Sequence, residues 1–107
     1  MKQWDVFLFP HPSTEDPHPA VVLSNNGICS NSDVQFINAL PCHSVRPITR
    51  PKKSNEVYLN AADGLDGKTL VKCDFVLVFH KTQAMEKRGE VCPQRVAEIR
   101  KKLQEHF

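Results

Sequence analysis

Three consecutive residues near the middle of the chain, Lys72, Cys73 and Asp74, have side chains suited to proton transfer and anion binding. Side chains two residues apart on a β-strand point to the same face, so an extended segment sets the Lys72 ammonium group beside the Asp74 carboxylate. Such a pair can hold a charged group and exchange a proton with it. The same pair also fits an ordinary surface ion pair, because charged pairs mark functional sites only statistically.

This group lies in Glu56–His80, where the strand and turn signals of the chain are densest. Glu56–Leu59 is predicted to be a short strand. Asn60–Lys68 contains two glycines beside aspartates, which favours turns. Thr69–His80 is apolar, rich in β-branched residues and free of a helical stripe. It is therefore predicted to form one strand, or two strands that meet at a bend near Cys73–Asp74.

Three further strands are predicted before this segment, at Trp4–Phe9, Ala20–Leu23 and Val34–Leu40. The second is continuously apolar, which indicates burial on both faces. His11–Pro19, between the first two strands, contains three prolines and is predicted to be a stiff exposed loop. Ser24–Asp33, between the second and third, is polar and is predicted to be a turn.

The end of the chain has the pattern of a long helix. Pro93 fits the first helical position, and one apolar stripe is formed by Val96, Ile99, Leu103 and Phe107. Before the helix, Lys81–Gly89 is predicted to be a polar connection that turns at its final glycine, and Glu90–Cys92 a short edge strand. The predicted fold is mainly β with a C-terminal α-helix, as a small, mostly antiparallel, partly open barrel.

Length and composition limit the class of protein. A chain of 107 residues is predicted to form a single domain over residues 1–107. Its 40% hydrophobic and 24% charged residues are ordinary for a globular protein, and its net charge of +2 permits a nucleic-acid partner without requiring one. The apolar run Val6–Phe9 is too short for a signal core or a membrane span, so a cytoplasmic protein with no membrane contact is expected.

The four cysteines and five histidines are dispersed along the chain. They form neither a CxxC nor an HExxH motif, so the cysteines are expected to be reduced thiols. A zinc site built from Cys42–His43 and Cys73–Asp74 has no standard spacing, and no metal or other cofactor is expected.

Pro41–Asn55 is predicted to be a second long loop, and it carries the basic residues Arg46, Arg50, Lys52 and Lys53. Basic loops suit contacts with phosphate groups. They are equally typical of a solvated surface loop, and the residues alone leave both interpretations open.

Five segments, taken in order, carry a family resemblance. They are the opening WDVFLFP, then HPAVVLSN from His18, then QFINALPCHS, then EVYL followed by GLDGKTLVKCDFV, and finally EKRGEVCPQRVAEIRKKL. Together they resemble the strands and the closing helix of the MazF/PemK (Kid) family of bacterial toxins. The fourth is similar to the family's V-x-L…GL…S-x-V-x-CDQ-x-R segment. The order and spacing match over nearly the whole chain.

The resemblance implies an SH3-like barrel with a C-terminal helix, of the CcdB/MazF/Kid type and usually homodimeric. It implies a toxin endoribonuclease that cleaves single-stranded RNA, as mRNA, without a metal and is neutralised by a cognate antitoxin protein. Asp74 matches the aspartate of the family's CDQ segment. Lys72 stands where some members have arginine, His18 replaces the arginine before the proline of the second strand, and Phe75 and Leu77 replace the Gln and Arg of that segment.

Metal-free RNA cleavage needs a base for the 2′-hydroxyl, an acid for the leaving 5′-oxygen and cations for the phosphoryl group. Asp74 is the expected base. His18 is an expected acid or base, because histidine gains and loses a proton near neutral pH. Lys72 is expected to stabilise the phosphoryl charge, although it lacks the bidentate fork of arginine. The further expected RNA contacts are Arg46, Ser44, Cys42, Arg50 and Lys52.

Each residue also has a plainer interpretation. His18 between two prolines fits a simple loop residue, Cys42 fits a small buried apolar group, and Ser44 fits a loop cap. The replaced arginines therefore leave open a second function, a catalytically degenerate RNA- or protein-binding module on the same barrel. A third, the poisoning of DNA gyrase by toxins of the CcdB type, shares the fold, and fold alone does not decide among them.

Overall fold

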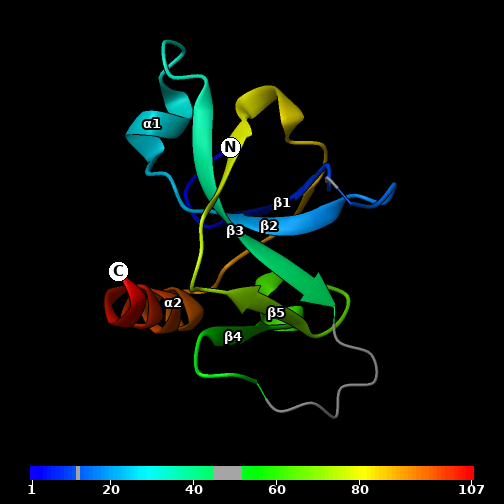
Figure 1. Ribbon diagram of the computed structural model, residues 1–107, viewed down its shortest axis with the longest axis vertical. Helices are drawn as coiled ribbons and strands as arrows, with labels where there is room; N and C mark the ends of the chain where they lie inside the picture. The colour runs from blue at the N-terminus through cyan, green and yellow to red at the C-terminus, as the bar shows by residue number, and fades with distance from the viewer. Residues whose placement is uncertain (12, 45–51) are drawn as a thin grey trace.

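The computed structural model describes residues 1–11, 13–44 and 52–107. It confirms a mainly β fold with a C-terminal helix: antiparallel strands curl into a half-open barrel, and helix α2 (Pro93–His106) lies beside strands β4 and β5 (Figure 1). The strand order is β4-β5-β3-β2-β1-β7, and β6 pairs with β3. The strands are β1 Asp5–Phe9, β2 His18–Val22, β3 Phe36–Ser44, β4 Glu56–Leu59, β5 Thr69–Lys72, β6 Leu77–His80 and β7 Lys87–Glu90.

The long strand β3 joins the two halves of the barrel. It pairs with β6 over Phe36–Ala39, with β2 over Ala39–Pro41 and with β5 over Cys42–Ser44. Figure 1 shows it running diagonally from the upper strands to the layer of β4 and β5. Because Pro41 has no N–H to donate, it suits the point where the ladder passes from β2 to β5.

The bounds of β3 differ from the predicted Val34–Leu40. The N–H of Val34 bonds the carbonyl of Asn31, so this residue belongs to a turn and the strand begins at Phe36. At its other end the strand continues through Pro41 to Ser44, into what was predicted to be loop. The extension matters for function, because it brings Cys42 and His43 onto the sheet.

Two other segments also differ from the prediction. The polar turn contains a one-turn helix, α1 (Asn26–Ser30), because the side chain of Asn25 accepts the N–H of Ile28 at 2.9 Å and caps it. Strand β2 begins at His18, two residues earlier than expected. Thr69–His80 forms two strands with a bend between them, which confirms the second of its two alternatives.

Gly89 was predicted to turn the chain but lies inside β7, paired with β1. A Cβ atom at this position would stand 2.1 Å from the carbonyl oxygen of Asp63. The glycine therefore serves a close approach between two backbones rather than a turn. The last strand accordingly covers Lys87–Glu90 instead of Glu90–Cys92.

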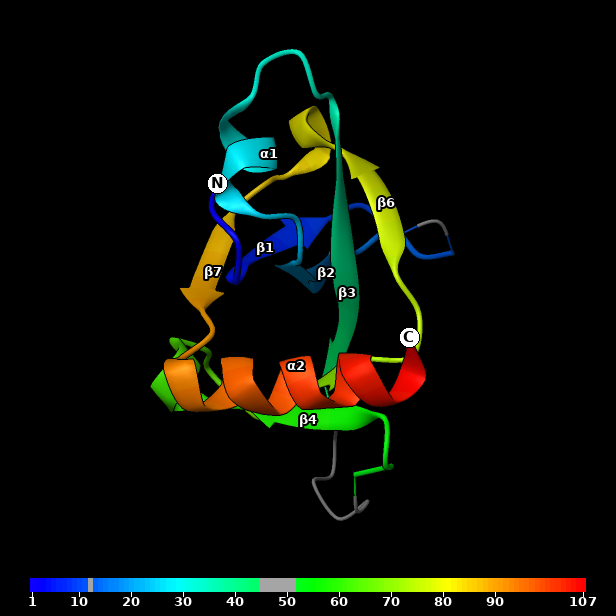
Figure 2. The ribbon, with the colours of Figure 1, turned by 90° about the vertical axis from the view of Figure 1, so that its left-hand side faces the viewer.

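The core confirms the predicted burial of the second strand, since Ala20, Val21 and Val22 are at most 2% exposed. Helix α2 packs against the core and runs along β4 (Figure 2). Its Ile99 is completely buried, which is worth about 1.5–3 kcal/mol. The predicted apolar stripe is wrong at its end: Phe107 follows the last helical residue and is 73% exposed.

A buried carboxylate fixes the start of α2. Asp63, in the 3₁₀ turn Ala61–Asp63, is 1% exposed and accepts the N–H of Asn60 at 3.0 Å and of Cys92 at 2.9 Å. The Nε atom of Arg95, in the first turn of α2, lies 4.0 Å from the same carboxylate. Cys92 gives the helix no side-chain cap, so Asp63 supplies the negative charge that a helix N-terminus favours.

Trp4 holds a left-handed backbone conformation, with φ of 75°. Its N–H bonds the carbonyl of Val22 at 2.8 Å, and its carbonyl accepts the N–H of Val91 at 2.9 Å, so both neighbours enforce this conformation. The guanidinium of Arg100 on α2 lies 5.5 Å from the centre of the indole ring. Trp4 thus connects the first strand to the helix.

Candidate functional site

A cavity of about 380 Å³ opens where the start of β2, the second half of β3 and the end of β5 meet. Its polar lining comes from three histidines and one cation, His11, His18, His43 and Lys72. Proline and aromatic side chains form the remaining wall, including Phe9, Pro41, Phe75 and Phe79. Proton-transfer groups beside a cation in a mostly apolar hollow form a site suited to an anionic substrate.

His18 lies at the first position of β2, paired across the ladder with Phe9. It is a strand residue, so the interpretation as a simple loop residue is wrong. Its ring centre lies 4.2 Å from that of His11, with 39° between the ring planes. The two imidazoles lie close together because His11 comes shortly after the end of β1, and His18 begins β2, which pairs with β1.

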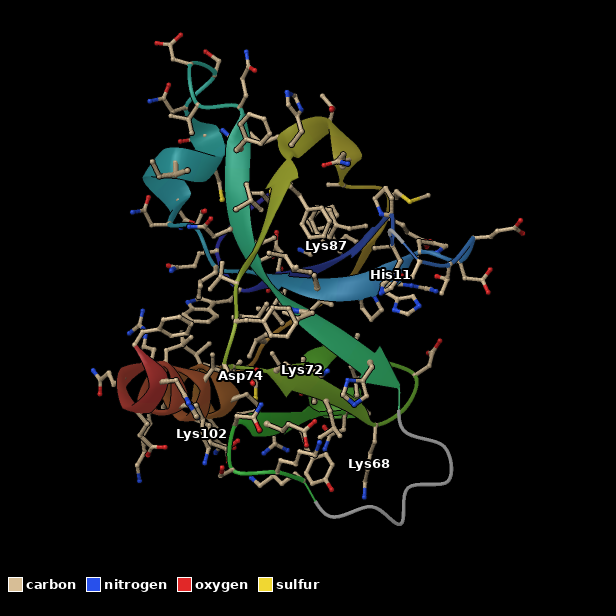
Figure 3. The ribbon with its side chains drawn as sticks, in the orientation of Figure 1. His11, Lys68, Lys72, Asp74, Lys87 and Lys102 are labelled. Atoms are coloured by element: carbon tan, nitrogen blue, oxygen red, sulfur yellow. The ribbon has the colours of Figure 1, made fainter. Side chains whose placement is uncertain are left out.

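Lys72 ends β5 and enters the same cavity, beside Phe75, whose ring centre is 5.9 Å from Nζ (Figure 3). Within the described ranges, no carboxylate stands within ion-pair distance of this ammonium group. Its charge is therefore available to a substrate anion.

His43 approaches the cavity from β3, and its Nε2 lies 3.7 Å from a carboxylate oxygen of Glu56 on β4. Glu56 is 1% exposed and accepts the N–H of Lys53 at 2.8 Å. It also stands opposite Lys72 in the β4–β5 ladder. The buried carboxylate of Glu56 thus places a negative charge beside the half-buried imidazole of His43.

Asp74 does not join these groups. β5 ends at Lys72, and Asp74 lies exposed in the following bend, so the expected strand placing both on one face is not formed. Figure 3 shows Asp74 beside the C-terminal helix, on the side of Lys102. Phe75, the next residue, lines the cavity, whereas Asp74 does not.

Cys42 lines the cavity but is only 3% exposed, and its thiol donates to the carbonyl of Leu40 at 3.8 Å. Burial raises the pKa of the Cys42 thiol, and the nearby Cys73 raises it further. Burial also raises the pKa of Cys73, to about 11. Both sulfurs therefore stay protonated and serve as small packing groups rather than nucleophiles.

The structure describes only some of the other residues that are expected to contact RNA. Lys52 has its Nζ 5.9 Å from the ring centre of Tyr58, and Lys68 lies 5.7 Å from the same ring. Only the backbone of Ser44, at the end of β3, belongs to the described structure. Arg46 and Arg50 lie outside the described residues.

The sequence did not single out His11, His43 or Glu56 for this site. The signal for His11 was a histidine at each end of the first proline-rich loop, which a hairpin brings together. His43 was hidden because its segment was predicted to be loop, and Glu56 because it stands opposite Lys72 only once strands β4 and β5 pair.

A second, larger hollow of about 710 Å³ lies between the N-terminus and α2, lined among others by Trp4, Asp5, Val96 and Arg100. The Asp5 carboxylate there is already engaged, by the N–H of Lys2 at 2.8 Å and by Lys87 at 3.4 Å. This hollow contains no histidine. The smaller cavity is therefore the better candidate for chemistry.

Over residues 1–11, 13–44 and 52–107, no three histidine, cysteine or acidic side chains are grouped so that they could hold a metal ion. In the same ranges, no helix has both the length and the apolar character needed to cross a membrane.

Known proteins resemble this chain over nearly its full length. The family model described as "PemK-like, MazF-like toxin of type II toxin-antitoxin system" matches residues 2–107. An endoribonuclease in complex with its cognate antitoxin, from a mycobacterial species, is 20% identical with a TM-score of 0.81, covering 99% of this chain and 93% of that one. No curated protein matches the chain.

Two further solved structures have the same fold. The Mycobacterium tuberculosis toxin MazF-mt6 is 14% identical with a TM-score of 0.78, covering 96% of this chain and 95% of that one. A MazE–MazF structure from Deinococcus radiodurans is 27% identical with a TM-score of 0.72, covering 98% and 94%. The fold implied by the sequence resemblance is confirmed.

Proposed function

Because the chain belongs to the PemK-like, MazF-like toxin family of type II toxin–antitoxin systems, we propose that it is an endoribonuclease that cleaves single-stranded RNA in the cavity of about 380 Å³. Endoribonuclease is the activity named for similar structures. The observation that carries the proposal is the meeting of His18, His43 and Lys72 in one cavity. Single-stranded RNA fits because its bases can splay out around a phosphate held in a small pocket.

His18 takes the proton of the 2′-hydroxyl as the 2′-oxygen forms a bond to phosphorus. The P–O5′ bond breaks, and the leaving 5′-oxygen takes a proton from the His43 imidazolium, which Glu56 stabilises at 3.7 Å. Lys72 offsets the charge that gathers on the phosphoryl oxygens. Each proton removed at one histidine is matched by a proton donated at the other, so the step balances without a metal.

Asp74 is the competing base, supported by its match to the family's CDQ segment. Its position outside the cavity favours His18 in this structure. The two assignments differ in a measurable way, because removal of the true base lowers kcat much more than removal of an exposed neighbouring carboxylate.

The partners follow from the same family. Structures of similar toxins contain antitoxins, and a cognate antitoxin protein is proposed for this chain also, together with assembly as a homodimer. An mRNA substrate would place the activity in the cytoplasm.

The test is cleavage of a long single-stranded RNA in EDTA by the wild type and by variants of equal folded content. His18→Ala is expected to lower the rate about 10²–10⁴-fold, and Lys72→Ala about 10²–10³-fold. His106→Ala and Lys101→Ala, on the C-terminal helix, are the matched controls and should cleave at the wild-type rate.

An Asp74→Ala variant measured beside them separates the two bases. A loss at Asp74 with full activity at His18 would return the base to Asp74. A folded wild type that binds RNA but leaves it intact would contradict the enzyme assignment and indicate the binding module instead.

A further inference from the structure

His11 is the polar residue of the cavity that the mechanism above does not use. It is separated from the end of β1 by Pro10, its ring centre lies 4.2 Å from that of His18, and it lines the cavity together with Lys72. Figure 3 shows it on the same side of the barrel as Lys72. Its location alone fits either a packing role or a contact with substrate.

One hydrogen bond fixes the proton position on His11. The backbone N–H of Ser13 donates to Nδ1 at 3.1 Å. A backbone N–H can only donate, so Nδ1 must act as an acceptor and carries no hydrogen. In this contact the ring hydrogen lies on Nε2, at the edge opposite Nδ1.

The neighbouring His18 has no such constraint. No hydrogen bond to either of its ring nitrogens is found within the described structure. The Ser13 contact therefore distinguishes His11, whose Nε2–H is the donor, from the His18 ring, whose centre is 4.2 Å away.

We infer that His11 is a phosphate-binding residue of the active site, which donates its Nε2–H to a non-bridging phosphoryl oxygen of the RNA. The inference rests on the proposed ribonuclease function. His11 adds a directed hydrogen bond to the undirected charge of Lys72, and it leaves proton transfer to His18 and His43. A hydrogen bond to a charged group of this kind is worth roughly a 10- to 100-fold effect on binding of the transition state.

Two substitutions distinguish a His11 that donates a hydrogen bond from a His11 whose ring only packs against His18. His11→Gln keeps an N–H group at about the reach of Nε2 but removes the ring, and His11→Phe keeps a ring against His18 but removes the N–H. The inference expects kcat/KM for RNA to fall about 10- to 100-fold in His11→Phe and much less in His11→Gln. Full activity in His11→Phe, or an equal loss in both variants, would overturn it.

A second measurement does not depend on cleavage. Nitrogen-15 spectra of the histidine rings report the tautomer and the bound state. They are recorded for the wild type with and without an oligonucleotide that has the sequence of the RNA substrate but lacks every 2′-hydroxyl. The expected result is an Nε2–H tautomer of His11 whose Nε2 signal shifts on binding. An Nδ1–H tautomer, or an Nε2 signal unmoved by saturating oligonucleotide, would overturn the inference.

The outcomes keep the two proposals apart. Wild-type cleavage with an unaffected His11→Phe variant contradicts only the role of His11. Absence of wild-type cleavage contradicts the ribonuclease assignment, while the nitrogen spectra still decide whether His11 contacts phosphate.

Discussion

Replacement of Asp63 should destabilise the protein more than any exposed change nearby. Its carboxylate accepts two backbone N–H groups, from Asn60 and Cys92, at 3.0 and 2.9 Å, and it is 1% exposed. Hydrogen bonds to a charged group are worth roughly 1.5–3 kcal/mol each. Asp63→Ala leaves both donors unpaired, and we expect the free energy of unfolding to fall by about 3–5 kcal/mol.

Such a loss is a large part of the roughly 5–15 kcal/mol that stabilises a domain of this size. At about 4–8 °C per kcal/mol, thermal unfolding should begin at least roughly 12 °C lower. Asp63→Asn is the sharper variant, because it preserves shape but offers one oxygen to two donors and should still lose about 2 kcal/mol.

The assay is urea unfolding followed by circular dichroism, with thermal scans as a second reading. Asp66→Asn, an exposed aspartate in the next turn, is the matched control and should stay within about 0.5 kcal/mol of the wild type. If Asp63→Asn were also within that margin, the carboxylate would not be anchoring the start of α2, and the reasoning from its two hydrogen bonds would be wrong.

Three further outcomes are expected. Gly89→Ala should unfold at markedly lower urea concentration than the wild type, because the added methyl group would stand 2.1 Å from a backbone oxygen; unchanged stability would show that the two backbones can separate. Cys42 and Cys73 should resist iodoacetamide in the native state and react on unfolding, as mass spectrometry can follow, because burial raises the pKa of both thiols; native labelling of either would contradict this. The hydrogen bond from Lys87 lowers the pKa of Glu90 in the folded state. The stability that this pair contributes is therefore present above the pKa of Glu90 in the unfolded chain, and it is lost as pH falls through the pKa of Glu90 in the folded protein. Glu90→Gln should therefore lower Tm slightly near neutral pH, with the difference from wild type vanishing in acid; a constant difference at all pH values would exclude the pair as its cause.

The sequence predicted those elements whose pattern is decided by burial. Ala20–Leu23 was readable as a buried strand because no polar side chain interrupts it, and the C-terminal helix because Pro93 and the spacing of Val96 and Ile99 agree. Both are local signals, so no knowledge of partners was needed.

The errors came from contacts between distant segments. Pro41 reads as a loop residue, but in the fold it occupies the place where β3 changes partners. Gly89 reads as a turn, but its role depends on the backbone of Asp63, which lies 26 positions earlier in the numbering.

The candidate site, like the fold, was predictable from the sequence only in part. Lys72 and His18 were proposed from residue type and family resemblance, and the structure brings both into one cavity. Asp74 was paired with Lys72 on the assumption of a continuous strand, and the end of β5 separates them. His43 and Glu56 meet only through the pairing of β3 with β5 and of β5 with β4, which no local pattern reveals.

The strained Trp4 has a practical consequence. It is the one tryptophan in the sequence, and its indole ring is covered by Arg100 of the C-terminal helix. Intrinsic tryptophan fluorescence therefore comes from a single residue, which lies at the contact between the start of β1 and α2. A change in its emission before circular dichroism changes would reveal release of the helix from a barrel that is still folded, so this local opening can be followed without attaching a dye.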